Sequence, residues 1–319
     1  MSDPGRSLRF LTQADVVRLL DLDRLLESLA AAFVELSAGR ASVPPRIAAR
    51  TASGGLLGAM PGYMSGVLEA KVVSVFPQNH VRGLPSHQGL IALFDEGTGA
   101  PLAVMDGVAI TAIRTGASAA VAARWLARPE ATTLAILGAG VQGRSHFAAF
   151  PRVRDFKEIR IASRNAATAQ ALAAESPRAR AVATFKEAVQ GADMVCCCTD
   201  AREPVMKYEW LAPGAHVSSV GGTFGPELDA QTIGAGMIFV ESREAVRQPP
   251  PAGAHELQGL RPESVTEMGE VIAGTQPGRT RPDQLTVYKS SGHAVEDAAA
   301  AQLVYERAVA EGAGQLVSL

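Results

Sequence analysis

A glycine-rich turn in the middle of the chain constrains the fold more than any other feature. The stretch LAILGAGVQGRSH, residues 134–146, has an apolar run, three glycines in a GxGxxG pattern, and then residues typical of a helix. In such a unit the first glycine permits the tight turn, the second lets the backbone approach a pyrophosphate, and the third lets helix and strand pack closely. Unless the glycines only pack helix on strand, the pattern predicts a dinucleotide site at Gly138, Gly140, Val141, Gln142 and Gly143.

The end of the second strand indicates which nicotinamide cofactor the turn would bind. An acidic residue about 20 positions further on normally holds the adenine ribose hydroxyls. The strand EIRIA is followed instead by Ser163, Arg164 and Asn165. A guanidinium beside a hydroxyl suits a ribose 2′-phosphate, so the sequence favours NADP over NAD, unless Arg164 is only a solvated surface charge. Thr199, after the apolar stretch ADMVCCC, is assigned to the same cofactor site.

The order of apolar patterns predicts an α/β fold of about two domains for the 319 residues. Residues 14–38 have helical spacing, residues 43–107 have short apolar runs separated by turn residues, and residues 110–129 predict an alanine-rich helix. Strands that are apolar on both faces then alternate with helices, including a short strand near 181–183, as in a doubly wound parallel sheet. One more strand and a long helix are predicted within 283–312.

Composition and charge argue against nucleic-acid and membrane partners. The 30 Lys and Arg residues nearly balance 32 Asp and Glu residues, so the chain has no net field that attracts polyanions. It has no apolar run long enough to span a bilayer and begins without the pattern of a signal peptide, so we expect a cytoplasmic protein. The adjacent Cys196, Cys197 and Cys198 lack metal-ligand spacing; we expect buried, reduced thiols and no metal site.

Three cations in the first half of the chain occupy positions that are unusual for surface charges. Arg46 follows VPP, Lys71 opens the predicted strand AKVVSVF after an alanine, and Arg114 interrupts an apolar run before TGAS. Each of them alone fits an ordinary surface residue. Together they fit a clamp for an α-carboxylate, because Arg binds a carboxylate bidentately and Lys binds it as a point charge.

Three stretches resemble the ornithine cyclodeaminase and mu-crystallin family: DEGTGAPLAVMDGVAITAIRTGASAAVAARWLARP, ILGAGVQGRSH and YKSSGHAVEDAAAAQLVYERA. The resemblance extends over nearly the whole chain, and RTGAS followed by GAGVQG is its most specific part. It implies an α+β substrate-binding and dimerisation domain at 1–115 and 291–319, with a Rossmann NAD(P)-binding domain inserted at 116–290. It also implies a homodimer that acts on a small amino or imino acid.

The resemblance assigns roles to individual residues. It supports the three cations as groups that bind the substrate carboxylate, with Lys71 and Arg114 also catalytic. Thr115, expected at the start of its helix, matches a position that meets the cofactor phosphates, and Ser290 matches one near the nicotinamide amide. Two further residues stay open between a site role and an ordinary strand-edge or hydrogen-bonding role: Lys289 and Asp297.

Two positions depart from the pattern of ornithine cyclodeaminases. Thr223 stands where those enzymes carry an aspartate, and Gly58 stands where they carry a glutamate before the MP dipeptide. Without these carboxylates the second nitrogen of a diamine has no evident counter-charge, so ring closure by deamination is disfavoured. The predicted substrate pocket, with Met60, Tyr63 and Thr223, suits a small or cyclic imino acid.

The proton donor stays open between two residues. His87 in LPSHQGLIALF titrates near neutral pH and lies in an SHQ segment like that of mu-crystallin-like sequences, but it also fits a hairpin histidine bonded to a backbone carbonyl. Lys71 is the rival, if its surroundings tune its pKa. We interpret His146 and His293 as structural or peripheral residues.

These assignments predict an NAD(P)-dependent oxidoreductase that transfers hydride between nicotinamide and the α-carbon of a small amino acid or cyclic ketimine. The first alternative is an ornithine cyclodeaminase, a lyase that releases ammonia and recycles NAD within one turnover. The second is a non-enzymatic binding protein with the same fold, against which the three predicted cations argue.

Overall fold

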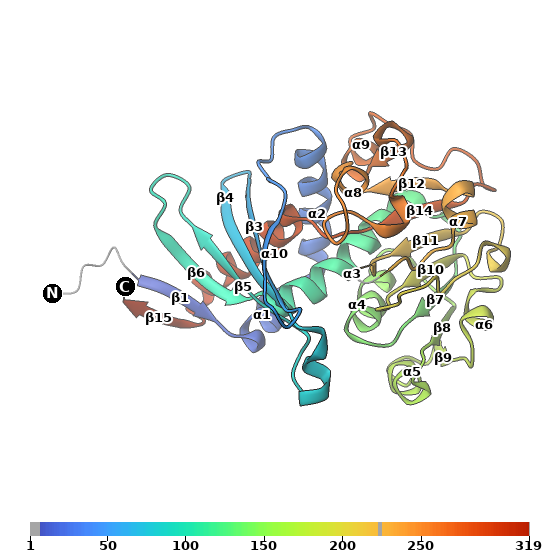
Figure 1. Cartoon of the computed structure of the whole chain (residues 1–319), viewed down its shortest axis with the longest axis horizontal. Helices are drawn as coiled ribbons and strands as arrows, with labels where there is room; N and C mark the ends of the chain where they lie inside the picture. Colours follow the sequence, from blue (N-terminus) through green and yellow to red (C-terminus); the bar gives the residue numbers. More distant parts are fainter. Residues whose placement is uncertain (1–6, 223–224, 319) are drawn as a thin grey trace. The chain divides into compact units, whose positions relative to one another are not determined.

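A computed structural model of the chain describes residues 7–222 and 225–318 (Figure 1). The chain forms two compact units: the first unit is Met1–Arg114 with His293–Leu319, and the second unit is Thr115–Gly292. The second unit is therefore an insertion in the sequence of the first, and helix α3 (Gly107–Leu126) contains the point of division. Among the described residues, no helix has the length and hydropathy that crossing a bilayer requires.

A seven-stranded sheet forms the first unit, in the order β15-β1-β6-β5-β4-β3-β2. Its neighbouring strands are antiparallel, except that β1 pairs with β6 in parallel. Buried and exposed residues alternate along much of β3, because successive side chains point to opposite faces and only one face is covered. The strands are β1 (Ser7–Leu11), β2 (Ile47–Arg50), β3 (Leu56–Met64), β4 (Val67–Val75), β5 (His87–Phe94), β6 (Pro101–Asp106) and β15 (Gln315–Ser318).

Helices α1 (Gln13–Leu19), α2 (Leu22–Ser37) and α10 (Ala294–Glu311) complete the first unit. α10 packs against β3, β4, β5 and α2, so it covers one face of the sheet. Leu25, Leu29 and Phe33 recur at helical spacing on the buried side of α2. They form a core with the buried face of the sheet and the alanine-rich side of α10.

An eight-stranded sheet forms the second unit, in the order β13-β12-β14-β11-β10-β7-β8-β9. Every neighbouring pair is parallel, and strand order reverses beside β7, which confirms the predicted doubly wound α/β fold. The strands are β7 (Thr133–Leu137), β8 (Glu158–Ala162), β9 (Ala179–Ala181), β10 (Met194–Cys197), β11 (His216–Ser219), β12 (Met237–Val240), β13 (Val265–Glu267) and β14 (Thr286–Lys289). The helices that follow α3 are α4 (Val141–Ala149), α5 (Ala166–Ala173), α6 (Phe185–Val189), α7 (Ala230–Ala235), α8 (Glu244–Arg247) and α9 (Met268–Ile272).

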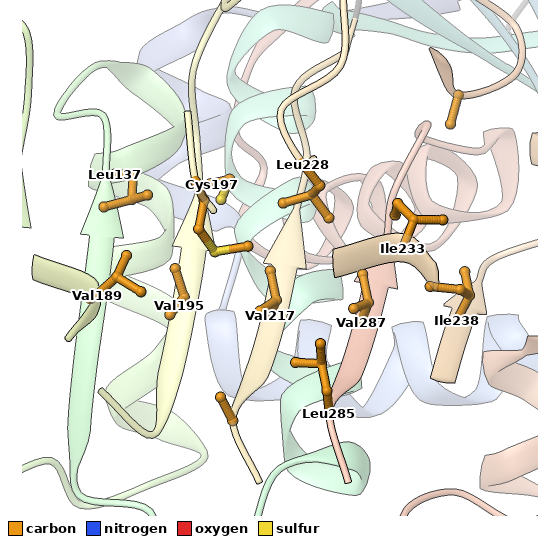
Figure 2. Close-up of a cluster of buried hydrophobic side chains, with 14 of the residues drawn as sticks. Leu137, Val189, Val195, Cys197, Val217, Leu228, Ile233, Ile238, Leu285 and Val287 are labelled. Carbon is orange, nitrogen blue, oxygen red and sulfur yellow. The ribbon is translucent and has the colours of Figure 1, made fainter. Parts of the chain in front are cut away.

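One layer of apolar side chains holds this parallel sheet to its helices. Figure 2 shows Val195, Val217 and Val287 side by side on β10, β11 and β14. Val189 of α6 and Ile233 of α7 pack in the same cluster. Such burial explains why these strands are continuous apolar runs in the sequence.

Three details differ from the sequence prediction. The short strand expected near 181–183 is Ala179–Ala181. The helix expected over 110–129 is Gly107–Leu126, so Thr115 lies in its interior and not at its start. β1 and β15 were not predicted, because both are short, β15 is mostly exposed, and they pair with each other across almost the whole length of the sequence.

Candidate active site

Lys71 lies at the centre of β4, not at its start, on the covered face of the first unit's sheet. The register places it opposite Met60 of β3 and Ile91 of β5, and its side chain is 4% exposed. Residues two apart on a strand share a face. Glu69 therefore projects to the same face, and it is 1% exposed.

α10 brings two carboxylates to Lys71 and Arg114. The Lys71 Nζ donates to Oδ1 and Oδ2 of Asp297, at 3.1 and 3.2 Å. The Arg114 Nε donates to the same Oδ1 at 3.0 Å, and its Nη1 donates to Glu296 Oε2 at 2.7 Å. Two of the three predicted cations thus meet at one oxygen of Asp297 within the first unit. Asp297 is therefore the shared hydrogen-bond partner of Lys71 and Arg114, and a role in substrate binding stays a prediction.

The same carboxylates fix the beginning of α10. Glu296 Oε2 accepts a hydrogen bond from the backbone N–H of His293 at 2.7 Å, as part of a capping box. One glutamate therefore caps the helix and pairs with Arg114. His293 is the residue that precedes α10, in keeping with the structural role expected for it.

Burial dominates the electrostatics of this cluster. Removal from water lowers the pKa of Lys71, although the carboxylate of Asp297 opposes this effect. Burial alone would raise the pKa of Asp297, but the charges and hydrogen bonds of Arg114 and Lys71 together bring it below 3.8. Asp297 is therefore ionised, and Lys71 releases its proton more readily than an exposed lysine does.

Glu69 is a third carboxyl group on this face, and the sequence analysis did not single it out. Both of its oxygens are buried, and neither has a hydrogen-bond partner among the described residues. Burial, followed by the charge of Asp297, raises the pKa of Glu69 to about 9. Glu69 is consequently uncharged at pH 7. The available signal in the sequence was an acidic residue two positions before Lys71, which was predicted to lie in a strand.

His87 begins β5, and the register puts it on the same face as Lys71. Although the residue is partly solvent-exposed, loss of hydration around its ring and then the charge of Lys71 lower its pKa from 6.5. Its Nδ1 lies 3.0 Å from Ser86 Oγ. At pH 7 His87 is therefore mostly neutral and better suited to accept a proton than to donate one. Its catalytic role stays a prediction.

Strand alternation separates two of the predicted pocket residues. Met60 is 8% exposed and lies directly opposite Lys71. Tyr63 is three residues further along β3, so it points to the other face, where its hydroxyl donates to Glu96 Oε2 at 2.8 Å. The expectation that Tyr63 shares a pocket with Met60 is therefore wrong, because an odd spacing on a strand changes the face.

Of the three remaining residues considered for the substrate site, the structure describes Gly58 and Arg46. Gly58 shares the covered face with Met60, and a Cβ at position 58 would meet its nearest neighbour at an ordinary 3.5 Å. The missing carboxylate at 58 is thus not a consequence of crowding. Arg46 is partly exposed just before β2, and its convergence with the other cations stays a prediction. Thr223 lies outside the described residues.

In the second unit, the glycine turn after β7 has the geometry that a phosphate site requires. Gly138 has φ +103°, and a Cβ there would collide with the carbonyl of Cys198. A Cβ on Gly143 would overlap the carbonyl oxygen of Gly138. Gly140, which precedes α4, faces open space: no atom of residues 7–222 or 225–318 lies within 4 Å of its Cβ position. The open backbone and the first N–H groups of α4 (Val141 and Gln142 among them) fit a pyrophosphate.

Ser163, Arg164 and Asn165 follow β8 as predicted. The Arg164 guanidinium donates to Asp200 Oδ1 at 2.7 Å, and both side chains are largely exposed, at 80% and 68%. Asn165 caps α5 by accepting the N–H of Ala167. Arg164 is therefore available to a solvent-exposed anion, but an exposed carboxylate lies beside it. That carboxylate has no counterpart in the sequence prediction.

Thr199 is fixed by a carboxylate that the sequence analysis missed. Its backbone N–H and its hydroxyl both donate to Glu227 Oε1, at 2.7 and 2.6 Å. Glu227 is fully buried at 0% exposure. A glutamate between a glycine-rich loop and α7 gives little sign of burial in the sequence.

Ser290 and Lys289 also have carboxylate partners. The Ser290 hydroxyl donates to buried Glu241 Oε1 at 2.5 Å. Lys289 Nζ is 3.0 Å from Glu256 Oε1 in an ion pair with side-chain exposures of 1% and 2%. Lys289 is thus a buried, paired residue at the end of β14 and not a simple strand-edge residue.

The remaining predicted residues occupy interior positions. Thr115 is 6% exposed within α3, where its backbone N–H belongs to the helix, so only its side chain suits a phosphate. His146 is fully buried against Phe150, and burial lowers its pKa to about 4.

The cysteines are buried free thiols, as expected: Cys196, Cys197 and Cys198. Among the described residues, no group of histidine, cysteine and acidic side chains suits a metal ion.

Comparisons with known proteins agree on one family. A model of the ornithine cyclodeaminase/mu-crystallin family matches residues 7–312. Ketimine reductase mu-crystallin of Rattus norvegicus is 39% identical over 257 residues, covering 79% of this chain and 80% of the rat protein.

Two solved structures resemble the chain throughout. Δ1-pyrroline-2-carboxylate reductase of Thermococcus litoralis, in complex with NADH and L-proline, has a TM-score of 0.90 and 34% identity, covering 97% of this chain and all of that one. An archaeal alanine dehydrogenase dimer with bound NAD has a TM-score of 0.89 and 30% identity, covering 98% of this chain and 99% of that one.

Proposed function

The chain belongs to the ornithine cyclodeaminase/mu-crystallin family, and from this premise we propose that it is an NAD(P)-dependent oxidoreductase of small amino or imino acids. The reaction is hydride transfer between nicotinamide and the α-carbon of the substrate. The observation that carries the proposal is the meeting of Lys71 and Arg114 at Asp297, because it places two cations together, one of them a lysine that releases its proton readily.

The chain's own residues supply binding and proton transfer. Arg46, Lys71 and Arg114 bind the substrate carboxylate, which must share the two buried cations with Asp297. Lys71 gives a proton to the imine nitrogen in the reducing direction, because its lowered pKa favours release. In the oxidising direction the neutral Lys71 amine takes the same proton back, and His87, mostly neutral at pH 7, is the alternative acid-base residue in both directions. Met60 borders the substrate as an apolar neighbour of Lys71.

The cofactor, when bound, supplies or accepts the hydride. Its pyrophosphate lies at Gly138, Gly140 and Gly143, and Gly140 with the first residues of α4 supports this because their backbone is open. Thr115, Thr199 and Ser290 complete the cofactor site. Ser163 and Arg164 bind the 2′-phosphate of NADP, so we expect a preference for NADP over NAD.

Two assays test the proposal. NADPH and NADH oxidation is measured at 340 nm with pyrroline-2-carboxylate, piperideine-2-carboxylate, and pyruvate plus ammonia as substrates. We expect net oxidation with at least one of them, and faster with NADPH. Ammonia release from ornithine with catalytic NAD, without net absorbance change, would instead identify a cyclodeaminase. Cofactor binding without any turnover would identify a binding protein.

We also propose a homodimer formed through the uncovered face of the first unit's sheet. Pairing registers put five exposed apolar side chains on that face: Phe10, Ile47, Leu57, Val72 and Leu90. A contiguous exposed apolar face of this kind usually marks an interface. The support from relatives is the alanine dehydrogenase dimer. Light scattering of the Leu90→Glu variant, expected to be monomeric, tests this surface, since an unchanged dimer would refute it.

A further inference from the structure

We propose that Glu227 is a positioning residue that holds Thr199, after β10, and Gly221, after β11, in the positions that bind the nicotinamide cofactor. The inference rests on the proposed function, because it presumes a dinucleotide at the carboxyl ends of these strands. Thr199 and Gly221 follow the ends of these two strands, and Glu227 accepts a hydrogen bond from the backbone of each.

Four donors meet the two oxygens of this carboxylate. Oε1 accepts the backbone N–H and the hydroxyl of Thr199, at 2.7 and 2.6 Å. Oε2 accepts the hydroxyl of Ser219 and the backbone N–H of Gly221, both at 2.8 Å. A carboxylate is an acceptor only, so it satisfies all four donors, whereas an amide in its place cannot. One side chain therefore joins the ends of two adjacent parallel strands.

A second layer of bonds extends the network to β14. Lys289 Nζ donates to Ser219 Oγ at 2.9 Å and to the carbonyl of Gly221 at 2.6 Å. Its ion-pair partner Glu256 accepts the backbone N–H of Glu227 at 3.2 Å. The carboxyl ends of β10, β11 and β14 are thus connected around Glu227 through a buried ring of bonds.

The network also reaches the phosphate turn. A Cβ on Gly138 would lie 3.3 Å from Thr199 Cγ2 and would collide with the carbonyl of Cys198. The phosphate turn after β7 and the segment after β10 are therefore in close contact. A Cβ on Gly221 would overlap both the Glu227 carboxyl carbon and the carbonyl oxygen of Thr199. With so little free space, a shift of Glu227 moves Thr199, and a shift of Thr199 moves the turn.

The test compares Glu227→Gln with Asp229→Asn. The amide at 227 turns an N–H group toward two of the donors. Asp229 caps α7 with Oδ1 and accepts the N–H of Tyr208 with Oδ2 at an exposed position, so asparagine keeps the cap and loses one exposed bond; the control thus repeats the loss of one acceptor oxygen away from the buried network. NADPH fluorescence titrations give the dissociation constant for each full-length variant. We expect it to rise roughly 10- to 100-fold for Glu227→Gln and less than about twofold for Asp229→Asn.

Further measurements separate positioning from a merely structural role. In Glu227→Gln, kcat falls and KM for NADPH rises, while KM for the imino acid and the dissociation constant of adenosine 2′-monophosphate, which has no phosphate for the turn, stay near wild type. Ser219→Ala, which removes one donor and the bridge to Lys289, weakens NADPH binding in the same direction. Ser219→Ala raises the dissociation constant for NADPH by a smaller factor in the Glu227→Gln background than in wild type, because both changes act on one network.

The outcomes are distinct. If wild type does not bind NADPH or NADH, the proposed function fails, independently of Glu227. If wild type binds cofactor but Glu227→Gln and Ser219→Ala keep its dissociation constant and kcat, with only a lower melting temperature, Glu227 is structural and the inference is overturned. Equal loss of affinity for adenosine 2′-monophosphate and for NADPH overturns it as well, because the damage is then general.

Discussion

Replacing Glu69 with glutamine is expected to stabilise the protein at neutral pH. The glutamate is buried without a hydrogen-bond partner, and its pKa is raised from 4.5 to about 9. The folded state therefore holds a proton that the unfolded chain loses. The stabilisation that this proton provides is complete below pH 4.5 and is lost as the pH rises towards 9. Glutamine has nearly the same shape and does not titrate.

The magnitude follows from proton linkage. Between the two pKa values the loss amounts to about 1.4 kcal/mol per pH unit. At pH 7 this gives about 3 kcal/mol, a value that holds for any folded pKa above 7. The free energy of unfolding of Glu69→Gln, minus that of wild type, should thus be near zero at pH 4.5, about 3 kcal/mol at pH 7, and larger at pH 8.

Urea unfolding followed by circular dichroism measures this difference at each pH. Subtracting wild type removes the titrations common to both proteins, and hydrogen exchange of peptides from β4 and α10 localises the change to the first unit. Glu27→Gln on the exposed side of α2 is the matched control, expected to change stability by less than about 0.5 kcal/mol. A pH-independent difference for Glu69→Gln would refute the reasoning, since Glu69 would then be ionised in the folded state.

Five further substitutions test other parts of the structure. Asp297→Asn removes the charge shared by two buried cations and should lower the free energy of unfolding by about 3–5 kcal/mol in urea titrations; an unchanged midpoint would show that the cations have other partners. Gly143→Ala should lower stability by roughly 1–3 kcal/mol in thermal unfolding, because its Cβ overlaps a backbone carbonyl. Gly140→Ala, in open space, should melt like wild type but bind NADPH more weakly. Arg164→Ala should weaken NADPH binding about tenfold and leave NADH binding nearly unchanged. Asp200→Asn should tighten NADPH binding, because it removes the carboxylate beside Arg164. Equal effects on the binding of both cofactors would argue against a 2′-phosphate site at Arg164.

The sequence predicted the second unit well because its signals are local. Apolar runs, helix spacing and the glycines after β7 each depend on a few neighbouring residues, and the parallel sheet follows from their alternation. The edge pair of β1 and β15 shows the opposite case. Nothing near Ser7 or Ser318 indicates that they are partners, since the pairing joins opposite ends of the sequence.

The candidate site was predictable only where residue type sufficed. Lys71 and Arg114 stood out as cations in apolar surroundings, and the structure brings them together. Their common partner Asp297 stayed open, because contact between a strand and a distant helix is not written in local spacing. Glu69 and Glu227 were missed for a related reason: a charged residue is normally exposed, and burial of its carboxyl group is a tertiary property.

The antiparallel pairing of Ser7 with Ser318 makes the two ends of the described chain neighbours on one edge of the first unit's sheet. A short linker between Ser7 and Ser318 would close the backbone into a ring and keep the hydrogen bonds between β1 and β15. New termini can then be opened in a surface loop elsewhere by circular permutation. Affinity tags placed next to both strands would crowd this edge of the sheet, so a single tag disturbs the β1–β15 pair less.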